Sequence, residues 1–465
     1  MIRNNYLTIY RIRYKAFVSS LQVAWKGKKG IIAAFCSITT IFGIFFFTGF
    51  HAPAVSTLPA SSTAPEQGCA QAGPLIFSQT TIASLFPDDY FYQPCPPPAF
   101  PGMIDNRPVT VFTTLVPELQ SYVVKRFKRY RPLLASGVIV DATTGAVYVM
   151  ANYTDAADTQ QVFPDDVDNY CLYGGFPAAS LIKIVTAAAV MEKKGFNITH
   201  SLPVSGGFYT LYKHQLGLKK QRFRAQPVTL KKAFSKSINP FFGKLGIQYL
   251  NDEEFTEIAR SFLFNVPMAF DLPLQRSSVF NPETDFERAE RASGFNTRTT
   301  ISPLHAALIA SLPIGDGKIM RPYLIDRIVA DSGKDLYWCE KTLLSQPLSK
   351  KNVLQLSRLM QATVSQGTAR KSFRRLRRTK GYQDWTLGGK TGAINLPNLQ
   401  RRCEWYAGFA EKGDVKLGIA LVIVHKEQRT VKPSFVAAEL IKGCFKQKVA
   451  QTESAGGRAS VHPGA

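Results

Sequence analysis

The sequence predicts a mixed α/β protein of the α+β type, with an antiparallel sheet flanked by helices and an N-terminal transmembrane helix. Three observations predict this arrangement: an uncharged apolar run near the N-terminus, a buried helical pattern after residue 177, and short strand patterns at both ends of residues 107–448. Hydrophobic residues make up 45% of the 465 residues and charged residues 19%. This composition allows a sizeable core and excludes wholesale disorder.

The N-terminal region has the charge pattern of a membrane anchor. Residues 1–30 contain seven Lys and Arg and no acid, and residues 31–50 carry no charge. A helix of that length spans about 30 Å, the thickness of the hydrocarbon core. Because basic flanks stay on the cytoplasmic side, we expect a cytoplasmic segment at 1–30, a single-pass anchor in the cytoplasmic (inner) membrane at 31–50, and the remainder on the periplasmic or extracellular side. A signal peptide or a core helix is the alternative, but the run is long for either.

The composition changes again on both sides of the main domain. Residues 51–106 are rich in proline and poor in charge, which predicts an extended spacer between the anchor and the domain at 107–448. Residues 449–465, rich in Gly, Ser and Ala, are predicted to be a disordered tail. Seven cysteines in a chain of this length exclude a small disulfide-dense scaffold, and any pairing among them stays open.

The chain is strongly basic. Lys and Arg number 57 against 33 Asp and Glu, a formal net charge of +24. For an exported domain this excess favours a phosphate-bearing envelope polymer or a membrane surface as its partner. We expect no nucleic-acid partner, because the sequence contains no zinc-ligand spacing, RNA-binding aromatic motif or dense basic arm.

Hydrophobic patterns then predict the elements of the domain in order. Residues 137–150 form a hairpin with Gly145 in its turn, and residues 177–194 form a buried helix that ends at Gly195. The remaining patterns predict two more helices and three consecutive antiparallel strands: helices at 229–235, with a break near Pro240, and at 303–312, and strands at 385–391, 405–410 and 416–425.

Ser180-Leu-Ile-Lys183 opens the buried helix and is the first candidate for chemistry. Residues three apart share a helix face, so the serine hydroxyl and the lysine amine lie one turn apart. Serine becomes a nucleophile when a neighbouring base takes its proton, and burial lowers the pKa of a lysine toward the range of such a base. The helix N-terminus adds positive potential where an oxyanion would form. A capped helix with a surface lysine is the structural alternative.

Two further short motifs follow in the chain. Ser237-Ile-Asn239 lies at a break between helical segments, where the hydroxyl is suited to relay a proton and the amide to orient a ligand. Lys390-Thr391-Gly392 lies on a predicted strand, where an amine and a hydroxyl suit a substrate carboxylate and the glycine leaves room for it. The structural alternative for each motif is a turn.

In this order, on a helix, a loop and a strand, the three motifs are the signature of penicillin-binding proteins and class A β-lactamases. From about residue 107 to 448 the sequence resembles the transpeptidase domain of penicillin-binding proteins. Four other stretches resemble segments of that family: 113–120, 135–150, 365–370 and 405–409.

The resemblance implies a role for each motif residue. Ser180 is acylated by a peptidoglycan stem peptide ending in D-Ala-D-Ala, or by a β-lactam, and Lys183 is its base. Ser237 relays the proton and Asn239 orients the ligand. The resemblance assigns the terminal carboxylate of the substrate to Lys390 and Thr391, beside Gly392, and the oxyanion hole to the backbone amides of Ser180 and Ala393. It implies no metal and no cofactor.

Two residues depart from the family pattern. Ala393 stands where Thr or Ser is usual, which leaves substrate preference open, and His305 stands where Gln is more usual. The spacer is too short for a glycosyltransferase domain or a pedestal, so the chain resembles a short class B protein. A glycan polymerase is a possible partner that the resemblance leaves open.

The sequence therefore predicts a membrane-anchored D,D-transpeptidase that crosslinks peptidoglycan through a serine acyl-enzyme. Three alternatives stay open: a D,D-carboxypeptidase, a class D-like β-lactamase, and a β-lactam-sensing receptor. A class D enzyme prefers a small apolar residue where Asn239 stands, and a receptor needs a cytoplasmic effector, for which thirty N-terminal residues leave little room. Cleft shape decides whether water or an amine accepts the acyl group.

Overall fold

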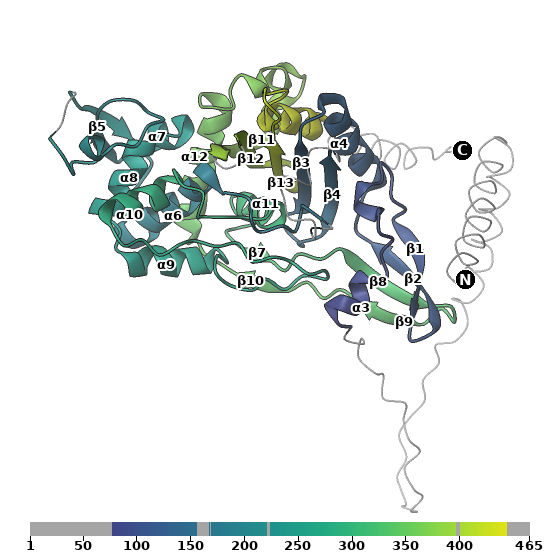
Figure 1. Cartoon of the computed structure of the whole chain (residues 1–465). Coiled ribbons are helices and arrows are strands. Elements are labelled where there is room, and N and C mark those ends of the chain that lie inside the picture. Colours follow the sequence, from purple (N-terminus) through teal and green to yellow (C-terminus); the bar gives the residue numbers. More distant parts are fainter. Residues whose placement is uncertain (1–76, 156–166, 168, 221–223, 397–399, 444–465) are drawn as a thin grey trace, which may run out of the picture. The chain divides into compact units, whose positions relative to one another are not determined.

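The computed structural model describes residues 77–155, 167, 169–220, 224–396 and 400–443 (Figure 1). The predicted cytoplasmic segment at 1–30, the anchor at 31–50 and the tail at 449–465 lie outside these residues. Within the described ranges, no helix is long and apolar enough to cross a membrane.

A five-stranded antiparallel sheet forms the centre of the described region (Figure 1). Its strand order is β11-β12-β13-β3-β4, so the last three strands of the chain lie beside the hairpin that begins the domain. The strands are β3 (Leu134–Asp141), β4 (Val147–Thr154), β11 (Thr386–Leu396), β12 (Arg401–Lys412) and β13 (Val415–Val424). The predicted antiparallel sheet is confirmed, and Gly145 lies in the hairpin turn with a φ of 85°.

Helices cover both faces of this sheet because both faces are apolar. Alternate side chains of a strand point to opposite faces, and here Val138 and Val422 join one buried cluster while Ile139 and Leu421 join another. The first cluster packs under α11 (Pro303–Ser311), and the second under α4 (Pro117–Tyr130) and a helix over residues 433–443. The prediction of a sheet flanked by helices is therefore confirmed.

The residues between the two halves of the sheet form a mostly helical region beside it (Figure 1). It contains α6 (Lys183–Lys194), α7 (Leu230–Lys236), α8 (Asn239–Gln248), α9 (Asp252–Ser261), α10 (Asp285–Ser293) and α12 (Lys350–Ser365). The helix predicted from residue 177 begins as a 3-10 turn, η2 (Ala179–Ile182), and continues as α6. Pro240 does not end a helix; it lies in the first turn of α8, where a missing N–H costs no hydrogen bond.

The described part of the predicted spacer, residues 77–106, is folded, which differs from the expected extended chain. It contains α3 (Gln79–Ala83), η1 (Tyr90–Tyr92) and β1 (Ala99–Ile104), and β1 pairs with β2 (Arg107–Thr113). Tyr90, Phe91 and Phe100 are buried in the same cluster as the helical region. Burying these rings stabilises the fold by several kcal/mol. Proline content alone does not predict that they are buried.

The remaining elements are short. β2 continues into a four-stranded sheet with β8 (Ile325–Ala330) and β9 (Asp335–Trp338). The others are two small ribbons and four 3-10 turns: β5 (Ser201–Val204) with β6 (Gln226–Thr229), β7 (Ile319–Met320) with β10 (Leu343–Ser345), η3 (Lys213–Gln215), η4 (Ser372–Arg374), η5 (Leu376–Arg378) and η6 (Tyr382–Asp384).

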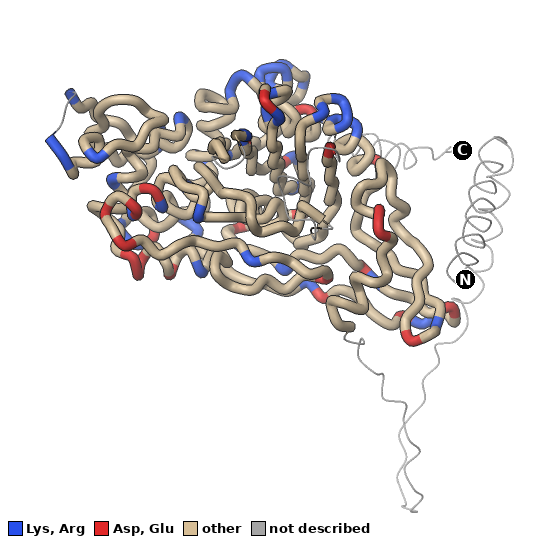
Figure 2. The backbone as a smooth tube through the Cα atoms, in the orientation of Figure 1, with Lys and Arg blue, Asp and Glu red and all other residues tan. Residues whose placement is uncertain are grey.

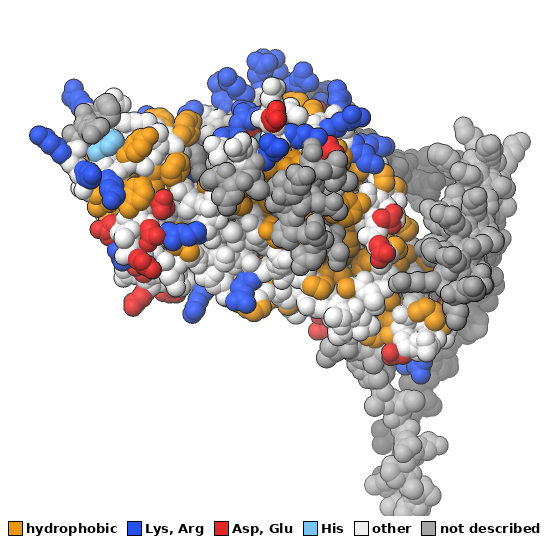
Figure 3. All heavy atoms as spheres, viewed as in Figure 1, with side chains coloured by type: hydrophobic (Ala, Val, Ile, Leu, Met, Phe, Trp, Pro, Cys, Tyr) orange, Lys and Arg blue, Asp and Glu red, His pale blue; other side chains and the backbone are white. Residues whose placement is uncertain are grey.

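Basic residues gather on one side of the sheet (Figure 2), and their side chains are exposed there (Figure 3). They come from α4 and from the 3-10 turns after α12, and Arg126, Arg375 and Lys442 line one shallow groove there of about 390 Å³. The basic residues of α4 and of the 3-10 turns are far apart in the sequence, but they lie together on the folded surface.

Candidate active site

Ser180 lies on η2, and a network of backbone contacts fixes the segment before it. The indole Nε1 of Trp405 on β12 donates to the carbonyl of Pro177 at 2.8 Å, and the amide of Ala178 donates to the carbonyl of Thr299 at 2.8 Å. Ala179 has a φ of 46°, in the left-handed region that costs a non-glycine residue about 1 kcal/mol or more. The turn is therefore held in a strained conformation that places Ser180 at the start of the helix.

Gly294, which ends α10, makes this turn possible. A Cβ at this position would lie 1.9 Å from the carbonyl oxygen of Ala179, and the residue has a φ of 67°. No side chain fits there. Gly294 was not predicted from the sequence, although a glycine after a helical run is the usual C-terminal cap and was a signal that could have located it.

Lys183 is fully buried below Ser180. Its Nζ lies 2.8 Å from the Oγ of Ser180 and 2.8 Å from the Oδ1 of Asn239, and it also donates to the carbonyl oxygen of Ser293. Burial, followed by repulsion from Lys390, lowers the pKa of Lys183 well below its usual value of 10.5. A neutral amine is thus favoured beside the serine hydroxyl.

Ser237 and Asn239 occupy the junction between α7 and α8. Ser237 caps α7 with a φ of 58°, and Asn239 begins α8. The Nδ2 of Asn239 donates to the carbonyl of Tyr209 at 3.0 Å, which turns its Oδ1 toward Lys183. The junction therefore directs the side chains of Ser237 and Asn239 toward the cleft that Ser180 also lines.

Lys390 and Thr391 approach from the opposite side, on β11. The Nζ of Lys390 donates to the Oγ of Ser237 at 2.9 Å and to the carbonyl of Thr391 at 2.8 Å. Burial lowers the pKa of Lys390 to about 7. The Thr391 hydroxyl shares a hydrogen bond of 2.6 Å with Thr368, a residue to which the sequence analysis gave no role.

Gly392 and Ala393 bring β11 against the segment that carries the serine. A Cβ on Gly392 would lie 3.4 Å from the carbonyl oxygen of Ala178 and 3.3 Å from the Cβ of Trp405, so Trp405 would have to move by a few tenths of an ångström. Ala393 follows it on the exposed edge of the sheet.

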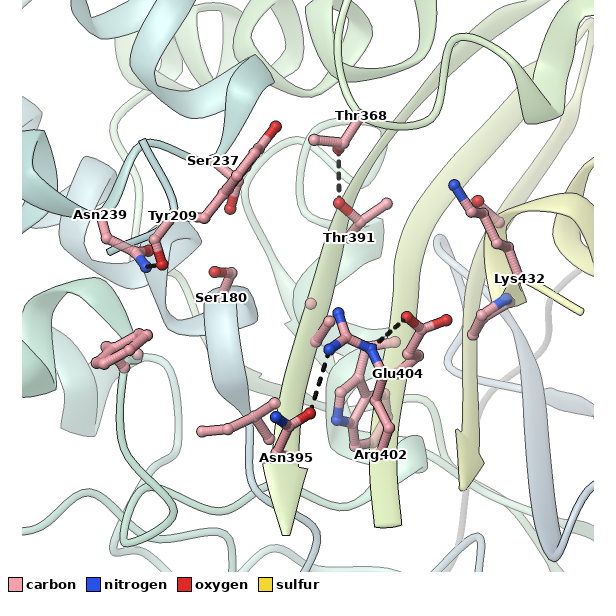
Figure 4. A pocket seen from close by; sticks show the side chains of 18 of the residues that line it. Ser180, Tyr209, Ser237, Asn239, Thr368, Thr391, Asn395, Arg402, Glu404 and Lys432 are labelled. Atoms are coloured by element: carbon pink, nitrogen blue, oxygen red, sulfur yellow. Dashed lines mark hydrogen bonds and ion pairs between the residues drawn. The ribbon is translucent and has the colours of Figure 1, made fainter. Parts of the chain in front are cut away.

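One open cleft of about 830 Å³ joins these groups (Figure 4). Ser180, Ser237, Asn239, Thr391, Gly392 and Ala393 line it, and Lys183 and Lys390 contact its lining from below. All eight residues singled out from the sequence therefore belong to one site. His305 is elsewhere: it is buried on α11, its Nε2 lies 2.6 Å from the carbonyl of Phe262, and burial lowers its pKa to about 4.

Beyond Asn395, the cleft contains a charged cluster that the sequence analysis did not predict. Glu404 on β12 contacts Arg402, Arg429 and His425, and it is the only acid among the described residues that line the cleft. Burial raises the pKa of Glu404, but hydrogen bonds from His425, Arg402 and Arg429 outweigh burial and lower it to about 2.

Comparisons with known proteins match this chain to one family. The family model described as the penicillin binding protein transpeptidase domain matches residues 135–445. The peptidoglycan D,D-transpeptidase PbpA of Mycolicibacterium smegmatis is 25% identical over 356 residues, which cover 69% of this chain and 68% of that protein.

Solved structures share the fold. The D,D-transpeptidase domain of a peptidoglycan glycosyltransferase from Eggerthella lenta matches with a TM-score of 0.56 and 24% identity, covering 73% of this chain and 83% of that one. The penicillin G acyl-enzyme complex of penicillin-binding protein A from Mycobacterium tuberculosis matches with a TM-score of 0.57 and 20% identity, covering 73% and 80%.

Proposed function

Because the chain belongs to the penicillin-binding protein transpeptidase family, we propose that it is a D,D-transpeptidase that crosslinks peptidoglycan through an acyl-enzyme on Ser180. We propose further that residues 31–50 anchor it in the cytoplasmic membrane and that the domain at 107–448 acts outside it. The substrate is a stem peptide ending in D-Ala-D-Ala, and β-lactams acylate the same serine.

The surroundings of the Lys183 amine carry this proposal. A neutral amine has two hydrogens and one lone pair. The Oδ1 of Asn239 and the carbonyl of Ser293 accept hydrogen bonds and cannot donate them, so they take both hydrogens. The lone pair is left toward the Ser180 hydroxyl, whose Oγ lies 2.8 Å away. Lys183 in this state is suited to be a general base.

Acylation then follows in two steps. The Ser180 Oγ attacks the carbonyl carbon of the penultimate D-Ala as its proton passes to the Nζ of Lys183. The tetrahedral intermediate collapses, the C–N bond to the terminal D-Ala breaks, and that amine leaves with a proton that the Lys390 ammonium gives up through the Ser237 hydroxyl, while Lys183 keeps the proton of Ser180. Ser237 is placed for this relay because its Oγ contacts Lys390 beside the cleft. In a β-lactam the corresponding C–N bond belongs to the ring, so the leaving amine stays attached.

The two ends of the scissile unit have separate binding groups. Thr391, paired with Thr368, and the Lys390 ammonium below it suit the terminal carboxylate. The backbone amides of Ser180 and Ala393 are proposed as the donors to the oxyanion, at the start of η2 and the edge of β11. Ala393 retains the amide that this role needs.

Slow hydrolysis distinguishes this proposal from a β-lactamase. A class A β-lactamase activates water with a carboxylate, and the described lining of the cleft offers one carboxylate for that purpose, Glu404. With its pKa lowered to about 2 and its oxygens engaged by Arg402, Arg429 and His425, Glu404 is a poor base. The acyl-enzyme is therefore expected to hydrolyse slowly and to persist until an amine of a neighbouring stem peptide attacks it.

The test uses the full-length chain, a synthetic donor peptide ending in D-Ala-D-Ala, and an amine acceptor, with products identified by mass spectrometry. We expect release of D-Ala and a new amide between donor and acceptor, and neither product with Ser180→Ala. Release of D-Ala with a hydrolysed donor alone would indicate a carboxypeptidase. Rapid turnover of penicillin by the same preparation would indicate a β-lactamase.

A further inference from the structure

We propose that the groove between α4, the 3-10 turns after α12 and the helix over residues 433–443 binds a polymer of polyol phosphates, such as a chain of glycerol phosphates. The inference goes beyond the proposed function, because the groove lies outside the cleft and its occupant is neither donor nor acceptor of the acyl group. The net charge of the chain left two partners open, a phosphate-bearing polymer and a membrane surface, and the groove favours the polymer.

Two short runs of the chain supply the charge of this surface. Residues 125–131, in α4 and directly after it, contain five Lys and Arg, residues 370–380 contain seven, and neither run contains an acid. Ten of these twelve basic residues are exposed, and Figure 2 shows the two runs on the same side of the sheet. Like charges this close repel one another and oppose folding. Their concentration on one surface therefore points to an anionic partner.

The groove lies where these runs meet a third element. Arg126 from α4, Arg375 from the junction of η4 and η5, and Lys442 from the helix over residues 433–443 line the same hollow of about 390 Å³. Arg126 is held in place, because its Nη2 donates to the Tyr122 hydroxyl at 2.7 Å and its guanidinium lies 4.6 Å from the centre of that ring. Three cationic side chains from distant parts of the sequence thus converge on one concave surface.

The groove stays positive after its one ion pair. Glu439 is the only acid that lines it among the described residues, and its Oε2 lies 3.5 Å from the Nε of Arg126. No ion pair among the described residues involves Arg375 or Lys442. Arg377 instead donates to three backbone carbonyls, two of them at the end of α12, and so fixes the turns that carry Arg375.

The kind of cation on this surface favours phosphate. Arg outnumbers Lys by eight to four in the two runs. A guanidinium presents several N–H donors in one plane and binds two oxygens of a phosphate at once, whereas an ammonium acts as a point charge. A polymer of phosphodiesters repeats its negative charge along its length, and it releases counterions when it meets such a surface.

The shape and composition of the surface favour a single polymer chain. A groove admits a chain but not the plane of a bilayer. Basic elements that lie on membranes also expose large apolar side chains, and proteins that bind single-stranded nucleic acids expose aromatic rings on which the bases stack. Of the exposed large hydrophobic side chains in the part of the chain that the structure describes, none belongs to residues 117–131, 370–380 or 433–443. A polyol phosphate offers phosphates without apolar or aromatic groups.

The groove and the cleft are neighbours with separate linings. The helix over residues 433–443 contributes Ser434 to the cleft and Lys442 to the groove, and the hydroxyls of Ser434 and Ser372 share a hydrogen bond of 2.8 Å. No described residue lines both. A polymer in the groove therefore lies beside the cleft without filling it, so polymer binding and acylation can be measured separately.

The test measures, by fluorescence anisotropy, the binding of a labelled glycerol phosphate oligomer to the full-length chain in a neutral detergent. The variant combines Arg374→Gln with Arg375→Gln, and the matched control combines Arg260→Gln with Arg276→Gln. All four arginines are exposed, and none pairs with an acid among the described ion pairs. Arg260 lies on α9 and Arg276 in the segment after it, and neither lines the groove or the cleft.

We expect the wild type and the control to bind the oligomer with similar affinity, and the Arg374 and Arg375 variant to bind it about thirtyfold more weakly. Each Lys or Arg close to a phosphate surface contributes roughly fivefold. Binding to the wild type should weaken as the salt concentration rises. Acylation by penicillin should be the same in all three proteins, because none of the substituted residues lines the cleft.

Four results would overturn the inference. No binding of the oligomer to the wild type, or equal affinity in the two double variants, would exclude the groove as its site. Stronger displacement of the oligomer by phosphatidylglycerol in mixed micelles than by unlabelled oligomer, at equal phosphate concentration, would assign the surface to a membrane. Stronger displacement by oligodeoxythymidylate would assign it to nucleic acid. These outcomes leave the proposed function intact, since it fails only if Ser180 is not acylated.

Discussion

At the scale of single residues, the site depends on keeping two lysines buried a short distance apart. Lys183 and Lys390 are each 0% exposed, and burial lowers the pKa of both. Each amine contacts one serine hydroxyl: Lys183 contacts that of Ser180, and Lys390 contacts that of Ser237. Burial therefore favours the neutral form of Lys183, which can accept a proton. Lys390, with a pKa of about 7, still carries a positive charge in part of the molecules at neutral pH.

Lys183→Met tests the base. The substitution retains the apolar volume and removes the amine, so we expect acylation by penicillin to fall about 10³-fold, within the range for loss of a general base. The melting temperature should stay the same or rise, because burying an amine is costly. Lys193→Met in the last turn of the same helix is the control, since Lys193 contacts only Glu257 among the described ion pairs. Equal acylation rates for the two variants would exclude Lys183 as the base.

The pH profile of acylation tests Lys390. Because burial lowers its pKa to about 7, Lys390 is protonated below that pH and neutral above it. We expect the second-order acylation rate constant to decline as the pH rises through about 7, when the carboxylate of penicillin loses its cationic partner. On the acid side the rate constant should fall because Lys183 becomes protonated. Lys390→Arg, which stays charged, should remove the alkaline decline; an identical decline in that variant would assign it to another group.

At the scale of elements, the nucleophile is positioned by contacts between segments distant in the chain. The 3-10 turn η2 begins with Ala179 in a left-handed conformation, and the end of α10 packs directly on its carbonyl at Gly294. β12 holds the preceding residue through Trp405. The position of Ser180 therefore depends on α10 and β12 as much as on its own helix.

Gly294→Ala tests this dependence. Its Cβ would lie 1.9 Å from the Ala179 carbonyl, so we expect a loss of about 2–4 kcal/mol in the free energy of unfolding and a large loss of acylation by penicillin. Gly195→Ala at the other end of α6 is the control: Gly195 has a similar φ of 65° but nothing within 4 Å of its Cβ. The Gly195→Ala variant should lose about 1 kcal/mol in the free energy of unfolding and keep the acylation rate of the wild type. Similar stability losses in both variants would show that the contact with Ala179 is unimportant.

The sequence predicted the elements better than their junctions. The hairpin at 137–150, the helix after Ser180 and the three final strands depend on local periodicity, and all are present. The contacts of Ser293 with Lys183 and of Gly294 with η2 join residues more than a hundred positions apart, so no local pattern reports them. The three motifs, with Ala393 directly after the third, placed eight residues of the site, but the cluster around Glu404 has no short motif and was missed.

At the scale of the whole molecule, the described residues before the expected domain boundary are part of its core. Phe100 on β1 is 2% exposed and belongs to the same buried cluster as α6 and α11. The recurring prolines predicted an extended spacer here. That prediction was wrong for residues 77–106 because composition does not show which aromatic rings become buried. β1 and β2 instead join a second sheet with β8 and β9.

Phe100→Ala tests whether this segment unfolds with the rest. Removing a buried phenylalanine costs about 3–5 kcal/mol, and we expect the whole described unit to unfold at a lower temperature in one transition. Met103→Ala on the same strand is the control, because Met103 is 58% exposed and should cost little. A separate early transition in Phe100→Ala, with the main one unchanged, would show that the segment folds independently.

The proposed function depends on a covalent bond between the substrate and the hydroxyl of Ser180. The most direct test is the intact mass of the full-length chain after incubation with penicillin G, followed over hours, with peptide mapping and Ser180→Ala beside it. We predict one penicilloyl group, located on the peptide that contains Ser180, persistent over hours and missing from Ser180→Ala. An adduct on another residue, an adduct lost within minutes, or no adduct on the folded chain would contradict the proposed acyl-enzyme.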